Sequence, residues 1–118
     1  MAINMHELSV TESILEIALR HAQNAGATRI TVLNLVIGQL SSLVDDSVQF
    51  YWDIISQGTL AEGATLNFRR IPVELGCLDC NERYQPPLDE LACPACGSIR
   101  IKVLSGEEFY VESIEVQS

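Results

Sequence analysis

Two pairs of cysteines are the residues of this sequence whose type and spacing most clearly indicate chemistry. Cys77 and Cys80 form one C-x-x-C knuckle, and Cys93 and Cys96 form a second. Each knuckle can place two sulfurs on one cation. The segment between the knuckles is long enough to fold into a hairpin that brings all four sulfurs together. Four thiolates in a closed tetrahedral shell favour structural zinc, because no position is left for water or substrate.

Two other kinds of site use such cysteine pairs. A redox-active pair needs a thiol whose pKa is lowered by nearby positive charge at a helix start, whereas the acidic residues Asp79, Glu82, Asp89 and Glu90 crowd these knuckles. A rubredoxin-like iron site also uses two knuckles, and the glycine after Cys96 suits it, but Asn81 follows Cys80. Zinc is therefore preferred, and the visible absorbance of the purified protein would distinguish iron from zinc.

His6 is the second candidate for metal chemistry, because it lies near the start of the chain within Met5-His6-Glu7. An imidazole and consecutive backbone amides can approach one ion together there, and square-planar nitrogen ligation suits divalent nickel or copper. A lone histidine in such a segment is more often no ligand at all, so the spacing leaves both interpretations open. The other histidine, His21, falls near the end of a predicted helix, where it suits the helix dipole.

Composition and charge limit the remaining functions. The chain has 118 residues, of which 47% are hydrophobic, enough for one compact domain with a small appendage. Sixteen acidic residues oppose seven basic ones, and the formal charge of -9 repels nucleic acids and anionic membranes. We find no secretory signal and no apolar stretch approaching the roughly 20 residues of a membrane-spanning helix, so we expect a cytoplasmic protein with reduced thiols.

Apolar periodicity predicts two helices and a first strand. Residues 8–25 have the spacing of one amphipathic helix, with a capping box of Ser9 and Glu12 at its start and Gly26 at its end. Residues 29–38 are rich in β-branched side chains and apolar on both faces, which predicts a central strand. Residues 47–57 again show helical spacing.

Two further strands and a metal-dependent insertion complete the predicted fold. A strand over 65–75 contains Pro72, which indicates a bulge or an edge position, and a last strand covers 108–116. Residues 76–106 hold all four cysteines but few large apolar side chains, so this segment needs a metal to fold. We therefore predict an α+β fold in which two helices pack on a small three-stranded mixed sheet. Residues 1–75 and 107–118 form its body, and 76–106 form an inserted zinc-ribbon-like module.

The order of four segments makes the chain resemble a known family. Met5-His6-Glu7-Leu8-Ser9 at a helix start, Val36-Ile37-Gly38-Gln39-Leu40, the segment Gly58 to Gly63 and the paired knuckles follow one another as in the HypA (HybF) family of hydrogenase nickel-incorporation proteins. The similarity extends from Met5 to Val116. It implies a metallochaperone, with a nickel-binding body and a zinc-binding module, that helps deliver nickel to the large subunit of nickel-iron hydrogenase together with a partner GTPase. Some family members also serve urease.

The resemblance also implies ligands for both metals. Nickel would bind the imidazole of His6 and the backbone amides of His6 and Glu7, and Asp45, matched after a one-residue shift, would lie near it. Zinc would bind Cys77, Cys80, Cys93 and Cys96. Family members usually begin at the methionine of the Met-His-Glu motif, so that its amine can join the nickel. Here Met1 to Asn4 precede Met5 and would displace that amine.

The residues predict no catalysis. We find no nucleophile with a neighbouring base, no convergent acid pair and no phosphate-binding loop, so the energy for metal transfer would come from the GTPase. The alternative function is a zinc-ribbon adaptor that scaffolds other proteins without nickel cargo. The client enzyme, hydrogenase or urease, stays open at this point, as does a homodimer formed by exchange of elements between chains.

Overall fold

The computed structural model describes residues 5–87 and 90–118, and for Met5 and His6 it describes the backbone alone. The chain folds into two compact units. The first comprises residues 5–36, 42–69 and 110–118, and the second comprises residues 37–41 and 70–109. The predicted metal module, 76–106, thus lies within the second unit. Among the described residues, no helix is both long enough and apolar enough to cross a membrane.

The first helix, α1, spans Met5–Asn24 and begins earlier than predicted. The predicted capping box is wrong, because Ser9 and Glu12 lie inside the helix and the Ser13 hydroxyl donates to the Ser9 carbonyl. Ser9 and Glu12 imitate a helix start because the apolar periodicity becomes visible only after them. The predicted end is confirmed: Gly26 has φ +68°, and the Ala27 amide donates to the Ala22 carbonyl, which together make a Schellman end.

The second helix, α2, spans Asp45–Ile55, slightly earlier at both ends than the predicted 47–57. Val48 and Trp52 are its buried residues, as the predicted spacing requires. The residue before the helix, Val44, has an extended backbone and no side-chain capping bond of its own. Asp45 and Asp46 lie in the first turn of α2, where their negative charges interact favourably with the positive N-terminal end of the helix dipole.

The first sheet has the strand order β2-β1-β6, with β1 (Arg29–Gly38) between β2 (Thr65–Ile71) and β6 (Phe109–Gln117). The central position and the bounds of β1 are as predicted. Hydrogen bonds from Thr28 to Gln117 and from Gly38 to Glu108 make β6 antiparallel to β1. Pairing of Asn34 with Asn67 and of Gln39 with Ile71 makes β2 parallel to it, so the sheet is mixed.

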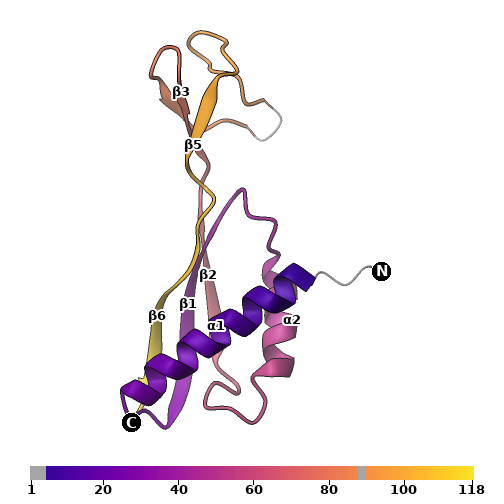
Figure 1. Ribbon diagram of the computed structural model, residues 1–118, viewed down its shortest axis with the longest axis vertical. Coiled ribbons are helices and arrows are strands. Elements are labelled where there is room, and N and C mark those ends of the chain that lie inside the picture. The colour runs from indigo at the N-terminus through magenta and orange to yellow at the C-terminus, as the bar shows by residue number, and fades with distance from the viewer. Residues whose placement is uncertain (1–4, 88–89) are drawn as a thin grey trace. The chain divides into compact units, whose positions relative to one another are not determined.

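The core of the first unit lies between this sheet and the two helices, which pack on each other (Figure 1). The apolar periodicity of residues 8–25 places Ile17 on the inward face of α1, but Ile17 is 41% exposed, whereas the polar residues Glu7 and Thr11 are buried. The fold class is otherwise confirmed. The buried apolar side chains of this unit are Ile14, Leu15, Ala18, Ala22, Ile30, Leu33, Leu35, Val36, Leu43, Val48, Trp52, Ala61, Ala64 and Leu66.

The predicted strand over 65–75 is in fact two strands in two different sheets. β2 ends at Ile71, and β3 (Glu74–Cys77) starts beyond Pro72. The alternation of apolar residues in the sequence changes phase near Pro72, and this change marks the passage from one sheet to the other rather than a bulge within one strand. Proline has no backbone N–H to donate to a ladder, so it suits the connection between the two strands.

The second sheet has the order β4-β3-β5 and is antiparallel throughout. β4 is Arg83–Tyr84, and β5 is Ile101–Ser105. Cys77, the last residue of β3, pairs with Ile101. β4 and β5 were not predicted individually, because a short strand in a segment with few apolar residues leaves no periodicity to detect.

Two glycines let backbone segments of the second unit approach closely. A Cβ on Gly38 would lie 2.0 Å from the carbonyl oxygen of Gly106, and Gly106 itself has φ +111°. The Leu40 amide donates to that same Gly106 carbonyl at 2.8 Å. The Val73 amide donates to Oε1 of Gln39 at 3.0 Å. The segment 37–41 is thereby fastened within the second unit.

Candidate metal centre

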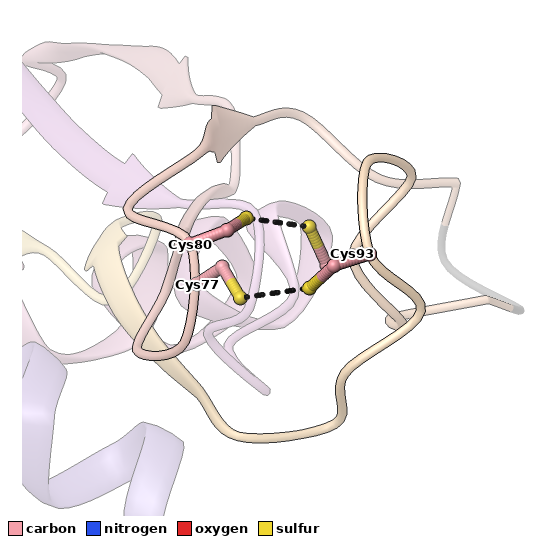
Figure 2. A group of neighbouring side chains, drawn as sticks. Cys77, Cys80 and Cys93 are labelled. Carbon is pink, nitrogen blue, oxygen red and sulfur yellow. Dashed lines mark hydrogen bonds between the residues drawn. The ribbon is translucent and has the colours of Figure 1, made fainter.

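The four cysteine side chains converge from the two knuckles (Figure 2). The Sγ atoms of Cys77 and Cys96 lie 3.6 Å apart, those of Cys80 and Cys93 lie 3.5 Å apart, and all four lie within 4.8 Å of one another. Cys77 and Cys93 are buried, whereas Cys80 and Cys96 are exposed. All four are free cysteines, and these separations far exceed the roughly 2.05 Å of a disulfide bond.

The size of the cluster fits a tetrahedral metal site. Zn–S bonds of about 2.3 Å place neighbouring sulfurs of a tetrahedron about 3.8 Å apart. The separations of 3.6 and 3.5 Å lie slightly below this value, and no pair of sulfurs is more than 4.8 Å apart. Four thiolates closing one shell leave no position for water, which is the arrangement of a structural zinc site rather than of a catalytic one. The cluster is therefore a metal site, and its donors suit zinc or iron.

The two knuckles share one local structure. In the first, the Asn81 amide donates to the Cys77 carbonyl at 3.1 Å, and Asn81 has φ 64°. In the second, the Gly97 amide donates to the Cys93 carbonyl at 2.8 Å, and Gly97 has φ 74°. Each knuckle thus turns through one left-handed residue after its second cysteine, and asparagine tolerates that conformation better than most side chains.

This equivalence removes one sequence argument about the metal. In the sequence, Asn81 departs from the glycine expected of an iron knuckle, yet in the structure it adopts the backbone conformation of its counterpart Gly97. The residue after Cys80 therefore does not discriminate zinc from iron. The choice of zinc depends instead on the chemistry of four thiolates and on the predicted structural role.

The thiols of Cys77 and Cys80 differ in pKa, because hydrogen bonds act on them in different ways. A backbone hydrogen bond from Cys80, assisted by one from Asp79, lowers the pKa of Cys77 to about 7 despite burial. At Cys80, the backbone hydrogen bond from Glu82 lowers the pKa, but the thiol of Cys93, partial desolvation and the thiol of Cys77 outweigh it and raise the pKa to about 12. A cation that replaces the protons of this crowded group relieves the repulsion among its thiolates.

A polar network joins the two knuckles beside the thiols. The Asp79 carboxylate accepts hydrogen bonds from the Ser98 hydroxyl and from Nη1 of Arg100, the latter at 2.8 Å. The Ser98 hydroxyl in turn accepts from the Arg100 amide at 3.0 Å. Asp79 belongs to the first knuckle, and the other two residues follow the second. Sequence reasoning treated Asp79 only as negative charge near the thiols and did not predict this link.

The predicted nickel ligands are only partly described. His6 lies in the first turn of α1, but its side chain and residues 1–4 lie outside the described part of the structure. Glu7 is buried, with its side chain 3% exposed. Asp45 is half-buried and is the first residue of α2.

A hydrogen bond connects the starts of the two helices. The Val44 amide donates to Oε2 of Glu7 at 2.8 Å, so the residue before Asp45 contacts the residue after His6. Sequence reasoning assigned Glu7 only a backbone amide and missed this contact of its carboxylate. A contact across 37 residues between a glutamate and a main-chain amide leaves no sequence pattern.

The fold and the cluster define a small α+β protein with four thiols grouped closely enough to hold one metal ion. Comparison with protein families identifies it further: residues 5–116 match the family described as "Hydrogenase/urease nickel incorporation, metallochaperone, hypA". The chain belongs to this HypA family of nickel metallochaperones.

Relatives and solved structures agree with this membership. The chain is 45% identical over 112 residues to the hydrogenase maturation factor HypA of Dehalococcoides mccartyi strain 195, covering 95% of this chain and 94% of the relative. It is 36% identical to the factor of Caldanaerobacter subterraneus, covering 96% and 100%. A solution structure of the nickel metallochaperone HypA from Helicobacter pylori shares 25% identity, with a TM-score of 0.67 over 95% of this chain and 97% of that one. A second, titled "Solution structure of HypA protein", shares 28% identity, with a TM-score of 0.73 over 97% and 98%.

Proposed function

We propose that this chain carries Ni(II) on the segment that contains His6 and delivers it to the large subunit of nickel-iron hydrogenase, while a zinc ion stays in the four-cysteine centre. The observation that carries the proposal is the closed cluster of four thiols. Because the cluster uses every cysteine of the chain, transient cargo needs another site. The family match begins at Met5, so the Met-His-Glu motif belongs to the matched region.

The backbone at His6 suits a nickel ligand. His6 and Glu7 lie in the first turn of α1, where N–H groups have no carbonyl four residues earlier in the helix to accept from them. Nickel that binds such amides does not break the hydrogen bonds of the helix. Together with the His6 imidazole they supply the nitrogen donors that square-planar Ni(II) prefers. In this proposal Asp45, at the start of α2, is the neighbouring acid.

The two metals have different duties in this proposal. Four soft ligands in a closed shell hold zinc permanently and fold the segment 76–106. A few nitrogen ligands at the start of a helix can bind nickel and release it again. A carrier needs this contrast, because cargo held in a closed shell could not be transferred.

We place the protein in the cytoplasm, with the GTPase of the maturation pathway and the hydrogenase large subunit as its partners. The GTPase supplies the energy of transfer, and the chain itself catalyses no reaction. The net charge of -9 favours partner surfaces that carry positive charge over nucleic acid or anionic membrane.

Titration calorimetry with Ni(II) tests this function on three proteins: wild type, His6→Ala and the matched control His21→Ala. His21 lies in the last turn of α1, so its removal deletes an imidazole without touching the proposed site. We expect one nickel on wild type and on His21→Ala, no tight binding to His6→Ala, and one zinc in all three. Hydrogenase maturation in cells should fail only for His6→Ala.

The adaptor function gives a different result. If nickel binding and maturation are unchanged in His6→Ala, whereas Cys93→Ser abolishes maturation, the chain acts through its cysteine module alone. That result would contradict the nickel carrier proposed here.

A further inference from the structure

Glu7 is a buried acid at a position where a helix usually exposes one. It lies in the first turn of α1, yet it is 3% exposed. Its Oε2 accepts a hydrogen bond of 2.8 Å from the amide of Val44, the residue before α2. Val44 cannot cap α2 with its own apolar side chain. Glu7 therefore brings a carboxylate from one helix to the positive end of another, where negative charge is favoured.

A second bond fixes the backbone of the same residue. The hydroxyl of Thr11, which is fully buried, donates to the Glu7 carbonyl at 2.6 Å. Glu7 is thus held both through its side chain and through its main chain. Burial of a carboxylate is costly unless it is hydrogen-bonded, and the Val44 amide supplies one such bond.

We propose that Glu7 is a positioning residue of the nickel site. This inference depends on the function proposed above. By fastening the start of α1 to the start of α2, Glu7 fixes the main chain from which His6 extends, and it holds that main chain one residue away from Asp45. Its carboxylate acts through the backbone it fixes and is not itself a nickel ligand.

The physical consequence is a smaller cost of organising the ligands. Square-planar nickel needs its donors at fixed positions, and a terminal segment without an anchor would have to be ordered each time the ion binds. Groups that orient metal ligands typically change metal affinity about 10- to 100-fold when they are removed.

The experiment compares Glu7→Ala, Glu7→Gln and the control Glu12→Ala, which removes an exposed acid from the same helix. Nickel affinity is measured by calorimetry and zinc content by mass spectrometry. The rate of hydrogen exchange of the Val44 amide is measured on the nickel-free protein. Alanine favours helix, so its effect is not a loss of helix propensity.

We expect Glu7→Ala to lower nickel affinity about 10- to 100-fold and to accelerate exchange at Val44, with one zinc retained. Glutamine keeps an oxygen that can accept the Val44 hydrogen bond, so Glu7→Gln should restore most of the affinity and most of the protection. Glu12→Ala should match wild type in all three measurements.

Three results would overturn the positioning role. One is unchanged nickel affinity in Glu7→Ala despite faster exchange at Val44. Another is unchanged exchange at Val44 in that variant. The third is a Glu7→Gln protein that protects Val44 but loses nickel, because the carboxylate would then be a ligand. Failure of the nickel function itself is seen separately, as equal nickel binding by wild type and His6→Ala.

Discussion

Asn81 and Gly97 occupy equivalent positions, one residue after the second cysteine of each knuckle, with φ 64° and 74°. The left-handed conformation costs an ordinary L-residue roughly 1–2 kcal/mol, and glycine adopts it without strain. Asn81→Gly should therefore leave zinc affinity and stability nearly unchanged. Asn81→Val, with a branched Cβ, should destabilise the zinc-loaded protein by about 1–2 kcal/mol in urea unfolding. Equal stability of the two variants would show that the knuckle does not require this conformation.

The acidity of the thiols predicts how zinc binding depends on pH. Cys77, with a pKa of about 7, is mostly deprotonated at pH 8 and mostly protonated at pH 6, whereas Cys80, with a pKa of about 12, is protonated at both. Zinc binding to the metal-free protein should release about one more proton at pH 6 than at pH 8, and zinc affinity should fall as pH falls. Calorimetry in buffers of different ionisation enthalpy measures this difference. Equal proton release at the two pH values would contradict the lowered pKa of Cys77.

Replacing Gly38 with alanine should destabilise the protein more than the same replacement at Gly26. A Cβ at Gly38 would overlap the backbone of Gly106, whereas a Cβ at Gly26 meets nothing within 4 Å and encounters only the strain of φ +68°. We expect Gly26→Ala to cost about 1 kcal/mol and Gly38→Ala about 3 kcal/mol or more in chemical unfolding. Similar costs for both would mean that the Gly38 backbone can shift away from Gly106.

The link between Asp79, Ser98 and Arg100 should slow the loss of zinc. Asp79→Ala removes the acceptor for both partners, so the two knuckles can separate more easily, and a chelator should extract zinc about tenfold faster. The control is Glu82→Ala, which deletes an exposed acid of the same turn. Because the ion pair with Arg100 is largely exposed, equilibrium stability should change by less than about 1 kcal/mol. Identical extraction rates for the two variants would contradict the bracing role.

The elements that could be predicted from the sequence were those with a local pattern. Both helices, the central strand and the last strand carry apolar periodicity, and the cysteine spacing predicts the cluster directly. The second sheet could not be predicted, because β4 is only Arg83–Tyr84 and β5 is exposed along most of its length. Pro72 was recognised as an interruption, but whether a strand bends or changes sheet there depends on contacts that are distant in sequence.

The candidate site residues also differ in how far the sequence predicts them. The four cysteines come in two C-x-x-C pairs, so their grouping can be predicted from their spacing. The hydrogen bonds that Glu7 accepts from Val44 and that Asp79 accepts from Ser98 join residues far apart in the chain through a carboxylate, a group common on any protein surface. The assignment of His6 to nickel still depends on the family pattern and stays a prediction.

Native mass spectrometry before and after one equivalent of Ni(II) counts both metals on one intact chain, so it shows whether zinc and nickel occupy separate sites. The purified protein should carry one zinc, and added nickel should give a species with one zinc and one nickel. His6→Ala should carry zinc alone under the same conditions. A wild-type species in which nickel has replaced zinc, or a His6→Ala protein that carries both metals, would contradict separate sites for resident zinc and nickel cargo.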